Sequence, residues 1–232
     1  MPFMTTKFKP LALLLLVLSV GPWFACRKAD VSSKAVAEAS QDEKVDDRPI
    51  ILAFGDSLTE GYGLEKSQSY PALLQKRIDE AGLRYRVVNA GISGDTTSGG
   101  LSRIEVALNL GQVEFMVLEL GPNDMLRGGD LKLARANLEG MIKAAKAKNV
   151  TVILAGMLAP PDRGVEYATE FANIYKELSA KYKLALIPFF LDGVAGKPEL
   201  NQADGMHPNS QGARIVTENV WKVLEPLVAR KK

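Results

Sequence analysis

The chain has 232 residues, of which 47% are hydrophobic, and this size and composition suit one substantial globular domain. Lys and Arg total 29 against 27 Asp and Glu, so the net charge of +2 offers no electrostatic attraction for a nucleic acid. We therefore expect a single hydrophobic core and no nucleic-acid partner.

The N-terminus has the pattern of an export signal. Lys7 and Lys9 precede an apolar run at 11–20 that is too short to span a bilayer as a stable helix. Cys26, the only cysteine, follows a small residue, as in bacterial lipoprotein signals in which the cysteine is lipidated. Ordinary cleavage near residues 35–37 is the alternative. We interpret residues 1–26 as a signal peptide for the periplasm, with Cys26 as a candidate lipid anchor to the membrane.

The segment after this signal differs in composition from the rest of the chain. Residues 27–48 mix charges with small residues and lack apolar periodicity, which is typical of a flexible, solvated linker. The domain is therefore expected to span residues 49–232. Because the chain has one cysteine, an intramolecular disulfide is excluded and the core must supply the stability.

From residue 49 onward, short aliphatic runs alternate with longer segments of helical spacing. The runs predict strands at 50–54, 85–89, 115–120, 150–157 and 184–188. The longer segments predict helices at 70–81, 98–109, 131–148, 166–182 and 210–228. One apolar stripe is clear within 131–148, at Leu131, Ala134, Leu138, Met141, Ile142 and Ala145. This alternation predicts an α/β fold with a parallel sheet covered on both faces by helices.

Polar turns follow the first three predicted strands. They are Gly55-Asp56-Ser57, residues 89–95 and residues 121–124. Ligands of open α/β sheets bind outside the carboxyl ends of the strands, so we expect these turns to meet in one crevice.

The single histidine, His207, is the first candidate for chemistry. Asp204 precedes it by three residues in a loop, close enough for its carboxylate to accept from Nδ1–H and leave Nε2 free. A structural histidine beside an aspartate that caps a helix is the alternative. One His and one Cys cannot assemble the usual His-rich or Cys-rich zinc site, and we expect neither a metal nor a cofactor.

Ser57 is the candidate nucleophile, since a serine hydroxyl becomes reactive when an adjacent base accepts its proton. Taken alone, Gly-Asp-Ser is more often a turn with Ser or Asp as a helix cap. Acyl transfer also needs donors for the developing oxyanion, and the Asn123 side chain and the Gly94 N–H are candidates. Both residues can equally be ordinary turn residues.

Four blocks of the sequence carry these candidate residues. They are Phe54-Gly55-Asp56-Ser57-Leu58, residues 89–95, Gly121-Pro122-Asn123-Asp124 and Asp204-Gly205-Met206-His207. Together and in this order, they resemble the SGNH, or GDSL, hydrolase family. The likeness is greatest to small bacterial periplasmic enzymes with thioesterase, arylesterase and lysophospholipase activity. Pro122 stands where that branch is expected to have glycine, and it leaves Asn123 in register.

The resemblance implies a flavodoxin-like, three-layer α/β/α fold with a five-stranded parallel sheet. It also implies that Ser57 is the nucleophile, His207 the base and Asp204 its orienter. The implied oxyanion hole consists of the Ser57 N–H, the Gly94 N–H and the Asn123 side chain.

The expected substrate is a small-molecule acyl ester or thioester. Four residues after the third and fourth strands are candidates for an apolar acyl groove: Met125, Leu126, Leu158 and Pro160. Covering the core is the alternative role for them. Two other functions stay open, a carbohydrate O-deacetylase with the same catalytic set and a non-catalytic, tethered binding lipoprotein. The sequence predicts no oligomeric state.

Overall fold

The structure is a computed structural model, and it describes residues 46–230. Five strands form one parallel sheet in the order β2-β1-β3-β4-β5. They are β1 (Ile50–Gly55), β2 (Arg86–Gly91), β3 (Val113–Glu119), β4 (Thr151–Ala155) and β5 (Ala185–Ile187). The predicted five-stranded, flavodoxin-like α/β fold is confirmed. In this order the chain reverses direction of winding between β1 and β3, which is where such sheets open a crevice at their carboxyl edge.

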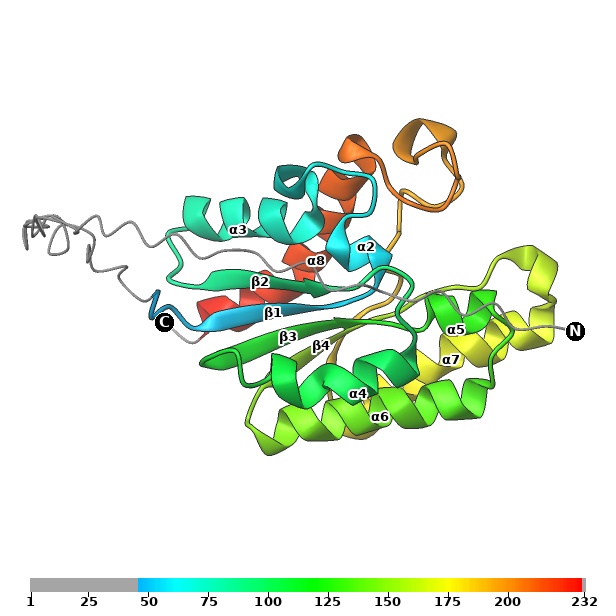
Figure 1. The fold of residues 1–232 in the computed structure, drawn as a ribbon, viewed down its shortest axis with the longest axis horizontal. Coiled ribbons are helices and arrows are strands. Elements are labelled where there is room, and N and C mark those ends of the chain that lie inside the picture. The colour runs from blue at the N-terminus through cyan, green and yellow to red at the C-terminus, as the bar shows by residue number, and fades with distance from the viewer. Residues whose placement is uncertain (1–45, 231–232) are drawn as a thin grey trace, which may run out of the picture. The chain divides into compact units, whose positions relative to one another are not determined.

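Helices cover both faces of the sheet (Figure 1). On one face α3 (Tyr70–Glu80) packs against α8 (Ser210–Ala229), and the other face carries α4 (Thr97–Ala107), α6 (Leu131–Ala147) and α7 (Val165–Tyr182). Five shorter helices lie in the connections: α2 (Ser57–Glu60), α5 (Pro122–Leu126), and the 3₁₀ turns η1 (Lys66–Gln68), η2 (Pro161–Arg163) and η3 (Pro198–Leu200).

The core lies between the sheet and these two helical layers. All six residues of β1 are buried, as a strand covered on both faces requires. The stripe predicted on α6 is buried along its whole length, and it faces the core. The predicted ends of strands and helices lie within two residues of the observed ends. The five short helices have too few residues to show a periodic pattern, and the sequence did not predict them.

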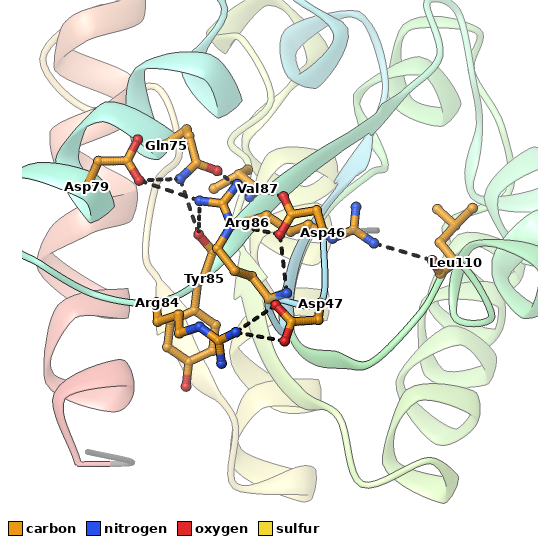
Figure 2. A network of polar contacts seen from close by, with 10 residues as sticks. Asp46, Asp47, Gln75, Asp79, Arg84, Tyr85, Arg86, Val87 and Leu110 are labelled. Carbon is orange, nitrogen blue, oxygen red and sulfur yellow. Dashed lines mark hydrogen bonds and ion pairs between the residues drawn. The ribbon is translucent and has the colours of Figure 1, made fainter. Parts of the chain in front are cut away.

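A polar cluster, the amino-edge cluster, lies at the start of the described chain (Figure 2). Arg48 pairs with Asp46 and donates to the Tyr85 carbonyl at 3.2 Å, while Arg84 pairs with Asp47 at 2.6 Å. These contacts fasten residues 46–48, which composition assigns to the linker, to the segment that leads into β2.

The predicted signal peptide, including Cys26, lies outside the described residues. Between residues 46 and 230, no helix combines the length and the apolar character that crossing a membrane requires.

Candidate active site

Ser57 begins a very short helix at the carboxyl end of the central strand β1. Asp56 caps α2, because its carboxylate accepts a hydrogen bond from Leu58 N at 3.0 Å. The helix stops after one turn at Gly61, whose φ of 88° is left-handed and suits glycine. A buried strand followed at once by a capped helix brings the Ser57 side chain to the crevice.

His207 faces Ser57 across this edge of the sheet. Its Nε2 lies 2.9 Å from Ser57 Oγ, and its Nδ1 lies 2.7 Å from Asp204 Oδ2. The other oxygen of Asp204 accepts from the backbone N–H groups of Met206 and His207 at 2.9 and 3.0 Å. These hydrogen bonds, the one from the His207 N–H above all, lower the pKa of Asp204 to about 2. The carboxylate is therefore ionised when it holds the imidazole.

The loop that carries Asp204 and His207 is closed at its base. An antiparallel bridge joins Asn201 to Pro208, and Gln202 N donates to His207 O at 2.8 Å. The cap of α8 is Asn209, whose side chain accepts from Gln211 N and Gly212 N. Asp204 is thus free of helix capping, and its contacts serve the histidine.

Two residues without a sequence prediction complete the surroundings of His207. The Tyr62 ring lies 4.7 Å from the imidazole, centroid to centroid, at an angle of 41°. Gln202 Nε2 donates to the Tyr62 carbonyl at 2.7 Å and to the Pro208 carbonyl at 3.0 Å. Gln202 therefore ties the histidine loop to the segment that follows α2. These contacts join distant parts of the chain, so no local pattern indicates them.

The second turn brings Gly94 to the same edge in a left-handed conformation, with φ of 78°. Its carbonyl accepts from Arg127 Nη2 at 2.7 Å, and the neighbouring Ser93 N donates to Glu60 Oε2 at 2.8 Å. Among the described residues, neither the Gly94 N–H nor the Ser57 N–H has a hydrogen-bond partner. Both N–H groups are available to an oxygen atom of a ligand.

Asn123 lies in α5, directly after Pro122, and bridges the other two turns. Its Nδ2 donates to Asp56 Oδ2 at 3.1 Å and to the Asp95 carbonyl at 2.9 Å. Both amide hydrogens thus have partners in the free protein. Binding of an oxyanion by Asn123 requires that one of these bonds be exchanged for the new one.

Two buried acids lie at the turn that carries Ser57. The residues Asp56 and Glu119 have exposed fractions of 1% and 0%. Burial raises the pKa of Asp56 to about 6, and burial together with the charge of Asp56 raises the pKa of Glu119 well above its usual range. The sequence analysis assigned no role to Glu119.

The four residues predicted to form the acyl groove differ in their burial. Met125 is buried, whereas Leu126, Leu158 and Pro160 are exposed. Arg163 Nη2 donates to the Leu126 carbonyl at 3.1 Å, which links the loops after β3 and β4. A small hollow of about 10 Å³ beside Ser57 and His207 is lined in part by other apolar residues, namely Leu58, Leu64, Tyr70, Phe190 and Val216, and the last three of these are buried. The structure thus offers an apolar wall next to Ser57 that the sequence did not predict.

No candidate metal centre is formed within residues 46–230, because no three His, Cys, Asp or Glu side chains gather in a suitable arrangement.

Comparison with known proteins gives consistent matches. Residues 53–215 match the family described as "GDSL-like Lipase/Acylhydrolase family". The chain is 44% identical over 178 residues to "Esterase TesA" of Pseudomonas aeruginosa, covering 77% of this chain and 89% of that protein. It is 36% identical over 178 residues to "Thioesterase 1/protease 1/lysophospholipase L1" of Escherichia coli, covering 77% and 84%.

A solved structure shows the same fold. The crystal structure of TesA superposes with a TM-score of 0.75 at 44% identity, and the match covers 77% of this chain and 99% of that one.

Proposed function

The chain belongs to the GDSL-like lipase/acylhydrolase family and is a hydrolase of carboxylic esters, and from this premise we propose that Ser57, His207 and Asp204 carry out the reaction. The observation that carries the proposal is the continuous relay from Ser57 Oγ through the imidazole to Asp204, with contacts of 2.9 and 2.7 Å. These are the distances that direct proton transfer needs.

The reaction runs in two steps. Ser57 Oγ attacks the ester carbonyl carbon while His207 Nε2 accepts the hydroxyl proton. The C–O bond to the leaving group then breaks, and His207 returns the proton to that oxygen, which leaves an acyl ester on Ser57. A water molecule attacks this ester with His207 again as the base, and the acid and free Ser57 are released.

Asp204 acts through the imidazole. Its carboxylate accepts from Nδ1–H, which keeps Nε2 free to accept the Ser57 proton and stabilises the imidazolium that forms. Because its pKa is about 2, it remains ionised throughout the neutral range.

The oxyanion of each tetrahedral intermediate is held by donors from three turns. The N–H groups of Ser57 and Gly94 have no protein partner among the described residues, and Asn123 supplies a third donor when it gives up one of its two present bonds.

The substrate class is a small-molecule ester of an apolar acyl or aryl group, or the corresponding thioester. Support comes from the apolar wall beside Ser57 and from the names of the relatives, which are an esterase and a thioesterase/lysophospholipase. Met125, Leu126, Leu158 and Pro160 are proposed as a second, outer wall. Export to the periplasm, with attachment to a membrane through a lipid on Cys26, is part of this proposal and rests on residues 1–26.

The test is a series of p-nitrophenyl esters, from acetate to palmitate, run beside acetylated sugars on the wild type and on Ser57→Ala. We expect turnover of the aryl esters and its loss in Ser57→Ala. A fluorophosphonate probe should label the wild type and leave Ser57→Ala unlabelled. Near-normal turnover by Ser57→Ala would refute the assignment of the nucleophile, and a preference for acetylated sugars would identify a deacetylase instead.

A further inference from the structure

Glu119, the last residue of β3, is fully buried beside the nucleophile turn and has no part in the reaction just described. One of its oxygens, Oε2, accepts two hydrogen bonds. Asp56 N donates to it at 3.3 Å, and Thr59 Oγ1 donates to it at 2.8 Å. The two donors stand on either side of Ser57 in the chain, so a single oxygen atom fixes the backbone before the nucleophile and the side chain after it.

The backbone at Gly55 packs closely against the Glu119 carboxyl group. A Cβ atom on residue 55 would lie 2.5 Å from Glu119 Oε2 and 2.6 Å from the Glu119 carbonyl oxygen. Only glycine allows β1 to pass so close to the carboxyl group. The acid is therefore part of the architecture of the turn that presents Ser57.

The surroundings of Glu119 are those of a neutral acid. No ion pair between residues 46 and 230 includes Glu119, and the negative charge of its neighbour Asp56 raises its pKa further. An unpaired charge at such a site would be costly, and a second negative charge nearby adds to the cost. Oε2 receives both donors, which leaves Oε1 for the proton. The carboxyl groups of Glu119 and Asp56 are also hydrogen-bond partners, so the protonated acid can donate to the Asp56 carboxylate.

Given that Ser57 is the nucleophile, as proposed above, we propose that Glu119 is a positioning residue that works in its protonated form. It holds Asp56 and Thr59, and with them Ser57, at the distance that His207 requires. Through Asp56 it also sets the acceptor that orients Asn123, since Asn123 Nδ2 donates to Asp56 Oδ2. A neutral amide can replace such an acid, because its oxygen can take the place of Oε2 and its NH₂ the place of Oε1–H.

The matched substitutions are Glu119→Gln, which keeps the acceptor and the neutrality, and Glu119→Leu, which keeps only the approximate volume. With p-nitrophenyl butyrate, Glu119→Leu should lower kcat about 10²-fold while KM stays nearly unchanged, since the reacting oxygen is displaced and the apolar wall is not. Glu119→Gln should retain kcat within about threefold of the wild type. The rate of fluorophosphonate labelling at Ser57 should follow kcat in both variants.

A second pair keeps the inference testable if Glu119→Leu does not fold. Thr59→Val removes one donor to Oε2, and Thr217→Val removes a buried hydroxyl of α8 that donates to the Ala213 carbonyl instead. At comparable Tm, Thr59→Val should have a kcat at least about threefold below that of Thr217→Val.

The role of Glu119 is refuted if the kcat of Glu119→Gln is less than tenfold above that of a folded Glu119→Leu protein. If Glu119→Leu does not fold, the role is refuted when Thr59→Val and Thr217→Val have equal kcat values. A dead Ser57→Ala protein beside a fully active Glu119→Leu protein would refute the role of Glu119 alone. An active Ser57→Ala protein would refute the proposed function itself.

Discussion

The two ends of the parallel sheet differ in how their charged side chains are placed: they are exposed and paired at one end, and at the other two of them are buried without a paired cation among the described residues. At the amino end, the Arg84–Asp47 pair of the amino-edge cluster is open to solvent, with side chains 70% and 74% exposed. At the carboxyl end, Asp56 and Glu119 are buried and have no cation as an ion-pair partner within residues 46–230. Exposed pairs of this kind contribute little to stability. Buried acids cost stability, which agrees with the positioning role that we propose for Glu119.

Removing the proposed base, His207, at the carboxyl edge should lower kcat more than any other change considered. His207→Ala leaves Ser57 without an acceptor for its proton, and kcat should fall by about 10⁴-fold or more. Steady-state kinetics with an aryl ester measure this, and Arg84→Ala serves as the control from the other edge. A loss below tenfold would show that another group acts as the base.

Removing a predicted oxyanion donor should have the second-largest effect. Asn123→Ala should lower kcat about 10²–10³-fold, because one donor to the developing charge is lost. The matched control is Asn219→Ala, since the Asn219 amide also donates to two carbonyls, those of Phe190 and Asp192, and to none of the three polar turns. Equal kcat values for the two variants would assign Asn123 a purely structural role.

Stability should respond to pH with opposite sign at the two edges. The pKa of Asp56 is raised to about 6 by burial, above the ordinary value of 3.8, so the folded state binds the proton more tightly. Stability from this group should therefore increase as the pH falls from about 7 to about 4, by on the order of 2 kcal/mol. Arg48 lowers the pKa of Asp46 to about 2, so stability from that pair is present above pH 4 and is lost toward pH 2.

Urea unfolding of the wild type and of Asp56→Asn measures the first of these effects. The amide does not titrate, so the difference in unfolding free energy between the two proteins should change between pH 7 and pH 4. A difference that is independent of pH would mean that Asp56 keeps an ordinary pKa in the folded protein.

The smallest effect is expected at the amino edge. Arg84→Ala should shift Tm by no more than about 3 °C and leave kcat unchanged, because the lost pair is exposed and screened. Thermal unfolding at low and high salt measures the shift, which should shrink as salt is added. A large Tm shift that persists in 1 M salt would show that the exposed Arg84–Asp47 pair contributes more to stability than its exposure suggests.

How much the sequence predicts depends on the separation of the interacting residues. The Asp204–His207 contact spans three residues and could be predicted from spacing, and the strands could be predicted because their apolar runs are continuous. Glu119 meets Asp56 from 63 positions away, and Gln202 meets the Tyr62 carbonyl from 140 positions away. No local pattern contains such pairs. The wall beside Ser57 was not predicted for the same reason, since Leu58 and Val216 come from helices at opposite ends of the domain.

The closed loop at residues 201–208 allows the proposed acid and base to be inherited together. The bridge from Asn201 to Pro208 holds the proposed acid and base, Asp204 and His207, in one short closed loop, and the contact from His207 to Ser57 joins this loop to a distant segment. A single exchange of this short segment between related proteins therefore transfers a functional pair intact. The recipient has to supply a serine at the correct distance and the donors for the oxyanion.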